Sequence, residues 1–197
     1  MSLLRRLIVR NMLLDRQLEL LATCGVRPNP GVGLADLLAN HRESEYERSP
    51  FKLLLCVLGS ESGQEPHSRL SDNIWCLNVE CITAPGDYAR LAHRMAILAA
   101  DALPITDVHD EIDLRRGFAS LSFILSGREI MWHAKIEEGW IDRHIMTNFV
   151  DLLAAQDTDK YFTYLDLPGK ECLIGCATPQ ELAGLRKWTG LDFEWLG

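Results

Sequence analysis

Residues 118–136 read FASLSFILSGREIMWHAKI and predict an antiparallel hairpin. Phe118–Leu125 and Glu129–Ile136 are rich in the apolar and aromatic side chains that favour strands. Ser126-Gly127 between them is a good signal for a short turn, because glycine accepts the backbone conformation that two-residue hairpins need. The sequence therefore predicts an antiparallel sheet in the C-terminal half of the chain.

Further strands are predicted on both sides of this hairpin. Residues 75–81 alternate between apolar and polar side chains, which is typical of a half-buried strand. A second hairpin is expected where Pro168-Gly169-Lys170 separates two apolar runs. In chain order, the remaining predicted strands are residues 105–113, 161–167, 171–176 and 191–196.

Helical spacing dominates the first third of the chain. Leucines at that spacing predict an amphipathic helix over residues 4–21 that ends near Gly25, and a short helix follows over residues 34–38. Residues 41–48 are predicted to be a solvated connection of mixed charge. Ser49-Pro50 is expected to cap a helix over Phe51–Leu58, and the polar residues 59–71 are expected to form a mobile loop.

Later helices have clear N-terminal signals. Pro85-Gly86-Asp87 opens a predicted helix, and Asp142 stands where its carboxylate can accept hydrogen bonds from the free amides of another. Thr178-Pro179-Gln180-Glu181 is a capping box with proline in the first helical position, and Gly190 ends that helix.

The order of these elements predicts the fold class. Strands and helices do not alternate regularly, which argues against a doubly wound parallel sheet. We predict an α+β fold in which N-terminal helices are followed by one twisted, mainly antiparallel sheet with helices packed on one face. A single domain is expected over residues 1–197, with a helical part at 1–58 and a sheet-containing part at 72–197.

The charge of the chain is unevenly distributed. The net charge is -8, yet residues 1–100 hold 11 basic and 11 acidic side chains, whereas residues 101–197 hold 9 and 17. This balance argues against a general nucleic-acid binder, which would carry a basic stripe. An apolar content of 47% excludes disorder as the main state, and no apolar run is long enough to span a membrane.

The six cysteines are interpreted as reduced thiols, because most of them lie inside apolar runs. The basic N-terminus is not expected to be a secretory signal, since Arg10, Asp15 and Arg16 interrupt any apolar core. A cytoplasmic location is therefore expected. A cysteine nucleophile at Cys76 or Cys172 stays open, although no local motif supports it.

One segment has the residue types of a metal site. Asp107, His109, Glu111 and Asp113 would share one face of a strand, with room for a divalent ion. A solvated acidic edge explains the same pattern more simply, so neither a metal nor a cofactor is expected. The alternative is a metal-dependent hydrolase that uses His109 with Asp107, Asp110 or Glu111.

Two acidic stretches flank the first hairpin and are expected to meet at one end of the sheet. The first ends with Glu111 and Asp113, and the second contains Glu137, Glu138 and Asp142. Trp140 lies inside the second stretch, and an aromatic side chain in a charged rim is typical of interface hot spots. Trp140 is equally compatible with a role in fixing the following helix to the sheet. The sequence thus predicts a partner-binding patch of these six residues.

In size, acidity, element order and the Trp140-Ile141-Asp142 helix start, the chain resembles the immunity proteins of bacterial toxin systems. The resemblance implies a non-enzymatic cytoplasmic protein that neutralises a cognate toxin by placing carboxylates over its basic functional surface. The implied partner is a protein, with no role for nucleic acid or membrane. A structural homodimer without catalytic role is a further alternative.

Overall fold

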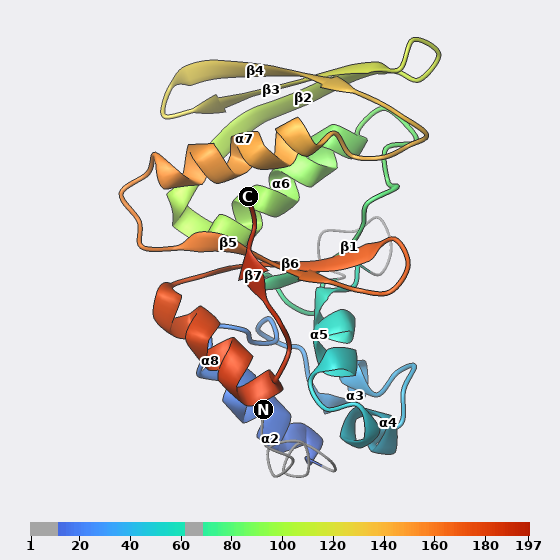
Figure 1. Ribbon diagram of the computed structural model, residues 1–197, viewed down its shortest axis with the longest axis vertical. Helices are drawn as coiled ribbons and strands as arrows, with labels where there is room; N and C mark the ends of the chain where they lie inside the picture. The colour runs from blue at the N-terminus through green and yellow to red at the C-terminus, as the bar shows by residue number, and fades with distance from the viewer. Residues whose placement is uncertain (1–11, 62–68) are drawn as a thin grey trace.

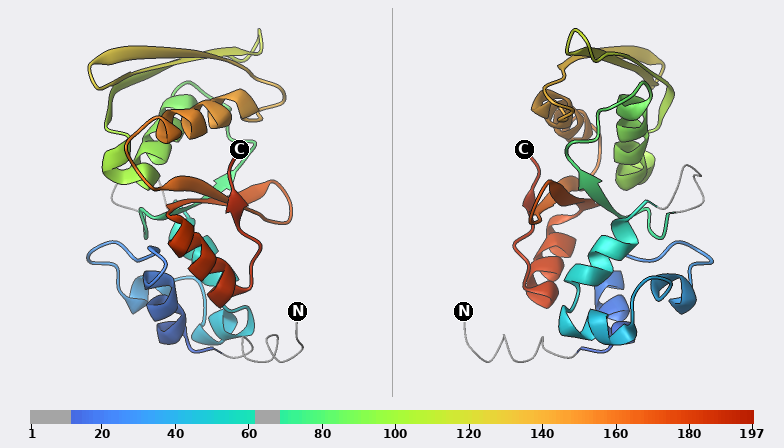
Figure 2. Two further views of the ribbon diagram at one scale, coloured as in Figure 1. Left: turned by 60° about the vertical axis from the view of Figure 1, so that its left-hand side comes forward. Right: turned by 90° about the vertical axis from the view of Figure 1, so that its right-hand side faces the viewer.

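The computed structural model describes residues 12–61 and 69–197, which form stacked layers (Figure 1). At the top lies a three-stranded sheet, and a pair of helices separates it from a four-stranded sheet, whose other face is covered by the remaining helices. The further views in Figure 2 show the same order of layers. In the described part of the chain, no helix is long and apolar enough to cross a membrane.

Both sheets are antiparallel. The three-stranded sheet has the order β2-β3-β4, from Ile105–Asp113, Phe118–Leu125 and Arg128–Lys135. The four-stranded sheet has the order β1-β6-β5-β7, from Ile74–Asn78, Glu171–Ala177, Tyr161–Asp166 and Glu194–Trp195. The α+β class, with N-terminal helices followed by antiparallel strands, is confirmed.

The β3–β4 hairpin forms as the sequence predicts. Ser126 and Gly127 both have positive φ, at 51° and 76°, which is the conformation of a type I′ turn. Leu125 pairs with Arg128 across that turn. Leu121 and Phe123 point inward from β3 and are only 1% exposed. The hairpin therefore presents one apolar face to the layer beneath it.

The middle layer is formed by α6 (Asp87–Ala99) and α7 (Arg143–Ala154), which lie between the two sheets (Figure 1). A core aromatic group joins this layer to the upper sheet. Trp132 of β4 meets Phe123 and Phe149 edge to face, with ring centroids 5.0 and 4.9 Å apart. Tyr88 of α6 accepts a hydrogen bond from the backbone amide of Asp142 at 3.1 Å and so ties α6 to the start of α7.

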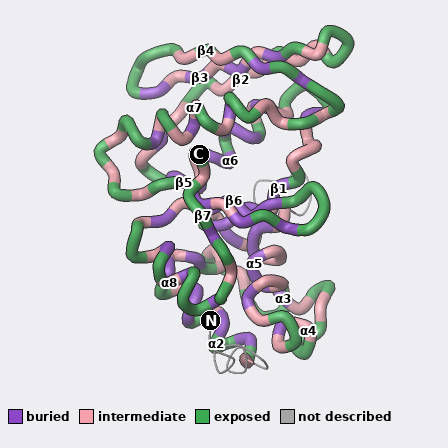
Figure 3. The backbone as a smooth tube through the Cα atoms, in the orientation of Figure 1, coloured by how far each residue is buried: buried purple, intermediate pink, exposed green. Residues whose placement is uncertain are grey.

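A second core fills the other side of the four-stranded sheet. The helices that cover this face are α2 (Leu14–Ala22), α3 (Leu34–Leu37), α4 (Glu43–Arg48), α5 (Lys52–Gly59) and α8 (Pro179–Thr189). Ile74 and Leu173 of the sheet pack against this group and are almost completely buried. Buried residues run along β1 and β6 in the middle of the molecule (Figure 3).

Two features of the predicted sheet are wrong. The strands form two sheets instead of one, and helices cover both faces of the four-stranded sheet instead of one face. The reason is that a side-chain pattern shows which faces are buried but not which strands pair. The strand β1 pairs with β6, from Ile74↔Gly175 to Asn78↔Glu171, across about half of the chain.

The N-terminal helices also differ from their predicted bounds. Within the described residues, the helix predicted over 4–21 is represented by α2, which begins at Leu14 after Leu13 with ψ 145°; the predicted residues 4–11 lie outside the described residues. The segment predicted as a solvated connection contains α4, where Tyr46 is fully buried and its hydroxyl donates to the Leu37 carbonyl. The buried ring of Tyr46 thus anchors α4, although most of the other side chains of this helix are charged. Most of the predicted 59–71 loop, residues 62–68, also lies outside the described residues.

The predicted Ser49 cap of α5 does not form, and a side chain from another helix binds the backbone just before α5. Phe51 precedes α5 with φ 66°, and no side chain from its own segment caps it. Instead, the buried Gln17 of α2 accepts a hydrogen bond from the Phe51 amide at 2.7 Å. Its amide nitrogen donates to the Tyr46 carbonyl at 3.1 Å. Gln17 therefore satisfies buried backbone groups that would otherwise be costly.

Candidate functional site

A groove with a volume of about 530 Å³ lies where α7 meets β5, β6 and the C-terminal residues. It contains Trp140, the aromatic residue that the sequence singled out. Its lining combines apolar and charged groups, including Trp140, Arg143, Met146, Tyr164, Lys170 and Trp195. A mostly apolar hollow with a few charged groups is the usual form of a binding site.

Trp140 ends a tight turn that begins at Glu137. The Trp140 amide donates to the Glu137 carbonyl at 2.9 Å, and the two central residues, Glu138 and Gly139, have φ 54° and 82°. These angles match a type I′ turn, which favours glycine in the second central position. The two glutamates are both exposed.

This turn is fastened to the segment that follows β1. The Ile82 amide donates to the Gly139 carbonyl at 2.9 Å, and the Ile141 amide donates to the Val79 carbonyl at 2.9 Å. The Trp140 side chain remains 40% exposed, and Lys170 Nζ lies 6.0 Å from its ring centroid. Trp140 is therefore held by its backbone while part of its side chain remains accessible to solvent.

The C-terminal residues form another wall of the groove. Trp195 of β7 is 39% exposed and meets Tyr161 with ring centroids 5.4 Å apart. Tyr164 donates its hydroxyl to Asp166 Oδ1 at 3.1 Å, and burial with this bond raises the pKa of Tyr164 to about 12. Tyr164 thus stays neutral at physiological pH. Sequence reasoning missed this wall, because nothing near residues 161–195 signals that they approach Trp140.

Asp142 is the N-cap of α7. Its Oδ1 accepts from the His144 amide at 2.9 Å, and its Oδ2 accepts from the Lys135 amide at 2.8 Å. Burial alone would raise the pKa of this carboxyl, but these backbone amides and the His144 ring hold it below its usual range. The side chain is only 13% exposed. Asp142 is therefore engaged in the fold, and its predicted contact with a partner stays a prediction.

Glu111 and Asp113 lie at the other end of the predicted patch, on β2. Asp113 and Lys135 both pair with Phe118 of the central strand β3, so β2 ends at the same end of the sheet as β4, with β3 between them; from β4 the chain runs to the Trp140 turn (Figure 1). Asp113 Oδ1 accepts from the amides of Arg115 and Arg116 at 3.0 and 3.1 Å. The two acidic stretches thus share one end of the sheet, but β3 separates them and two arginines follow Asp113 in the β2–β3 turn.

Asp110 has a structural role that sequence reasoning did not identify. From β2 its carboxylate accepts hydrogen bonds from the amides of Gly86 at 2.8 Å and Ala89 at 3.0 Å. These are free amides at the start of α6, where a negative charge is favourable. Asp110 therefore caps a helix that is distant in sequence.

The metal-ligand alternative does not correspond to a site in the structure. Asp107 has φ 50°, and the β2–β3 register shifts between Thr106 and His109, so a bulge interrupts the strand at this point. Among residues 12–61 and 69–197, no three His, Cys, Asp or Glu side chains are arranged to hold a metal ion. Asp107, His109 and Glu111 belong to this part of the chain and do not form a ligand set.

Comparison of the chain with protein-family models, with curated proteins and with solved structures finds no match.

Proposed function

We propose that this chain is a binding protein that holds a protein partner at the mouth of the Trp140 groove. The supporting observation is the state of Trp140, which is 40% exposed while its turn is fixed by backbone hydrogen bonds. A large aromatic group that is already ordered loses little conformational entropy on binding, which favours affinity. Trp195, which is 39% exposed and lines the same groove, supplies a second aromatic contact.

The charges on the turn beside the groove indicate the sign of the partner's charge. Glu137 and Glu138 are exposed on the turn that carries Trp140. Carboxylates at a rim attract a basic surface and raise the association rate more than they raise the affinity. A basic toxin domain is the partner that fits this arrangement and the resemblance to immunity proteins.

The test uses the product of the gene adjacent to the one that encodes this chain. We expect the purified proteins to bind, and Trp140→Ala to weaken the complex about 30-fold, as for a hot spot worth about 2 kcal/mol. Trp188→Ala is the matched control, because Trp188 is 37% exposed and also lies beside a lysine, Lys187, but on α8. Glu137→Lys with Glu138→Lys should slow association about tenfold, and added salt should reduce this difference.

The proposal fails if Trp140→Ala and Trp188→Ala bind the partner equally well. It also fails if the neighbouring product neither binds this chain nor loses toxicity when the two are produced together.

A further inference from the structure

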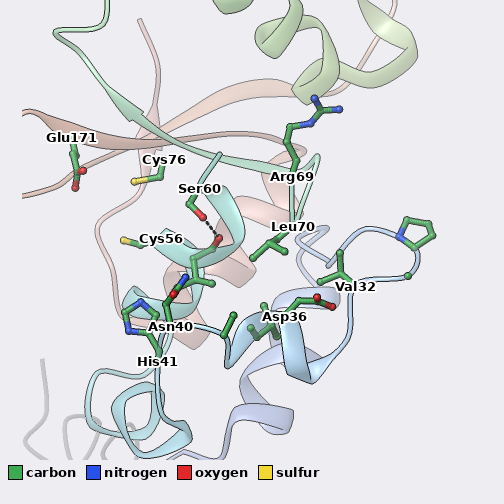
Figure 4. A pocket seen from close by; sticks show the side chains of 15 residues that line it. Val32, Asp36, Asn40, His41, Cys56, Ser60, Arg69, Leu70, Cys76 and Glu171 are labelled. Carbon is green, nitrogen blue, oxygen red and sulfur yellow. Dashed lines mark hydrogen bonds between the residues drawn. The ribbon is translucent and has the colours of Figure 1, made fainter. Parts of the chain in front are cut away.

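Cys56 of α5 and Cys76 of β1 face each other where the helix lies on the sheet (Figure 4). Both side chains line the same cavity, and both are partly exposed. Close packing of the two elements brings the sulfurs together: a Cβ built on Gly59 would lie 2.6 Å from the Cys76 backbone nitrogen. The fold therefore fixes this thiol pair, which is distant in sequence.

The pair lines a cavity of about 750 Å³ between α5, β1 and the segment 30–41, which contains α3. Polar side chains share its wall, including Asn40, His41 and Arg69 (Figure 4). A cavity of this size and polarity admits small polar solutes to the two sulfurs.

The two thiols have different surroundings. The adjacent Cys76 thiol holds the pKa of the Cys56 thiol below its usual value, against the effect of burial, and Lys52 one turn earlier on α5 assists. The neighbouring Cys56 and burial raise the pKa of Cys76, and the nearby Glu171 carboxylate adds to this effect. Cys56 is thus the better nucleophile, since the thiolate is the reactive form.

The other four cysteines do not combine partial exposure with a lowered thiol pKa. Cys24 and Cys172 are 3% and 2% exposed. Cys81 and Cys176 are partly exposed, but burial raises the pKa of Cys81 to about 11 and that of Cys176 to about 12.

We propose that Cys56 and Cys76 form a peroxide-reactive dithiol site that a small hydroperoxide converts into an intramolecular disulfide. The Cys56 thiolate attacks the terminal peroxide oxygen; an S–O bond forms, the O–O bond breaks, and the leaving oxygen takes up a proton to become water from hydrogen peroxide or an alcohol from an organic hydroperoxide. Cys56 is oxidised to a sulfenic acid and the peroxide is reduced. Cys76 sulfur then attacks Cys56 sulfur, and the sulfenic oxygen leaves as water with the Cys76 proton. The resulting bond links α5 covalently to β1.

The test treats the reduced full chain with hydrogen peroxide, alkylates the remaining thiols and maps the peptides by mass spectrometry. We expect the number of alkylated thiols to fall by two from the six present, with a cross-link between the peptides of Cys56 and Cys76. Cys76→Ser should stop at a sulfenic acid on Cys56 that a cyclic 1,3-dione traps, whereas Cys56→Ser should give neither product. Cys81→Ser is the matched control and should behave like the unmodified chain.

Oxidation of Cys81 as fast as Cys56 would overturn the proposal, since we expect Cys56 to react roughly tenfold faster or more. A disulfide between other cysteines would also overturn it. Circular dichroism checks that each serine variant is folded. If one is not, the peptide map of the unmodified chain decides alone, and the absence of the Cys56–Cys76 cross-link refutes the site.

Discussion

Replacement of Asp142 by alanine is expected to destabilise the protein by about 2–3 kcal/mol. Loss of an N-cap side chain costs about 1 kcal/mol, and up to about 2 kcal/mol where the cap is well packed. The second carboxylate oxygen accepts from the Lys135 amide at 2.8 Å, and loss of that bond adds about 1 kcal/mol. Solvent screening reduces this loss of stability only slightly, because the Asp142 side chain is only 13% exposed.

Thermal unfolding followed by circular dichroism measures the effect. For a chain of this length, about 1 kcal/mol shifts the midpoint by roughly 2–4 °C, so a decrease of about 4–12 °C is expected for Asp142→Ala. Asp151→Ala is the control, because Asp151 is exposed in the same helix. The capping argument is refuted if Asp142→Ala melts within about 1 °C of the Asp151→Ala variant.

Three further outcomes are expected. The pKa of the Asp142 carboxyl lies below its usual ~3.9, so its charge stabilises the fold above that pH and ceases to do so as the pH falls through the folded-state pKa. In urea titrations the unmodified chain should therefore be more stable than Asp142→Asn at neutral pH, and this difference should vanish in strong acid. Phe149→Ala should cost about 3–5 kcal/mol in urea unfolding, because it empties the centre of the aromatic group. Gly59→Ala should cost about 1–3 kcal/mol in the same assay, since its Cβ would lie 2.6 Å from the Cys76 nitrogen; Gly33→Ala, whose Cβ meets nothing closer than 3.8 Å, is the control.

The parts of the fold that could be predicted from the sequence are those that local chemistry decides. The turn at Ser126-Gly127 and the capping box at Thr178 involve neighbours in sequence, and both form as predicted. The pairing of β1 with β6 could not be predicted: β1 is buried on both faces instead of half-buried as the alternation over 75–81 predicts, β6 is buried on both faces too, and neither carries a signal for a particular neighbour. Burial of α4 depends on Tyr46, a single aromatic side chain among charged ones.

The residues of the candidate sites also divide into those that local sequence identifies and those that only tertiary packing brings together. Trp140 was identified because it stands alone among carboxylates, and its turn is a local structure. Trp195 reaches the groove only through the pairing of β7 with β5, and Lys170 through the β5–β6 turn. Similarly, Cys56 and Cys76 meet because α5 packs on β1. Such contacts depend on tertiary packing, which no short sequence window contains.

The structure also changes what the acidic C-terminal half implies about binding. Asp110 and Asp142 each accept hydrogen bonds from backbone amides at the start of a helix, and Asp113 accepts two in a turn. These carboxylates stabilise the fold through hydrogen bonds, and a charge count cannot distinguish them from carboxylates that are free to contact a partner. Glu137 and Glu138, by contrast, are exposed on the turn that presents Trp140. Electrostatic steering toward the groove should therefore depend on these two charges far more than on the net charge of -8.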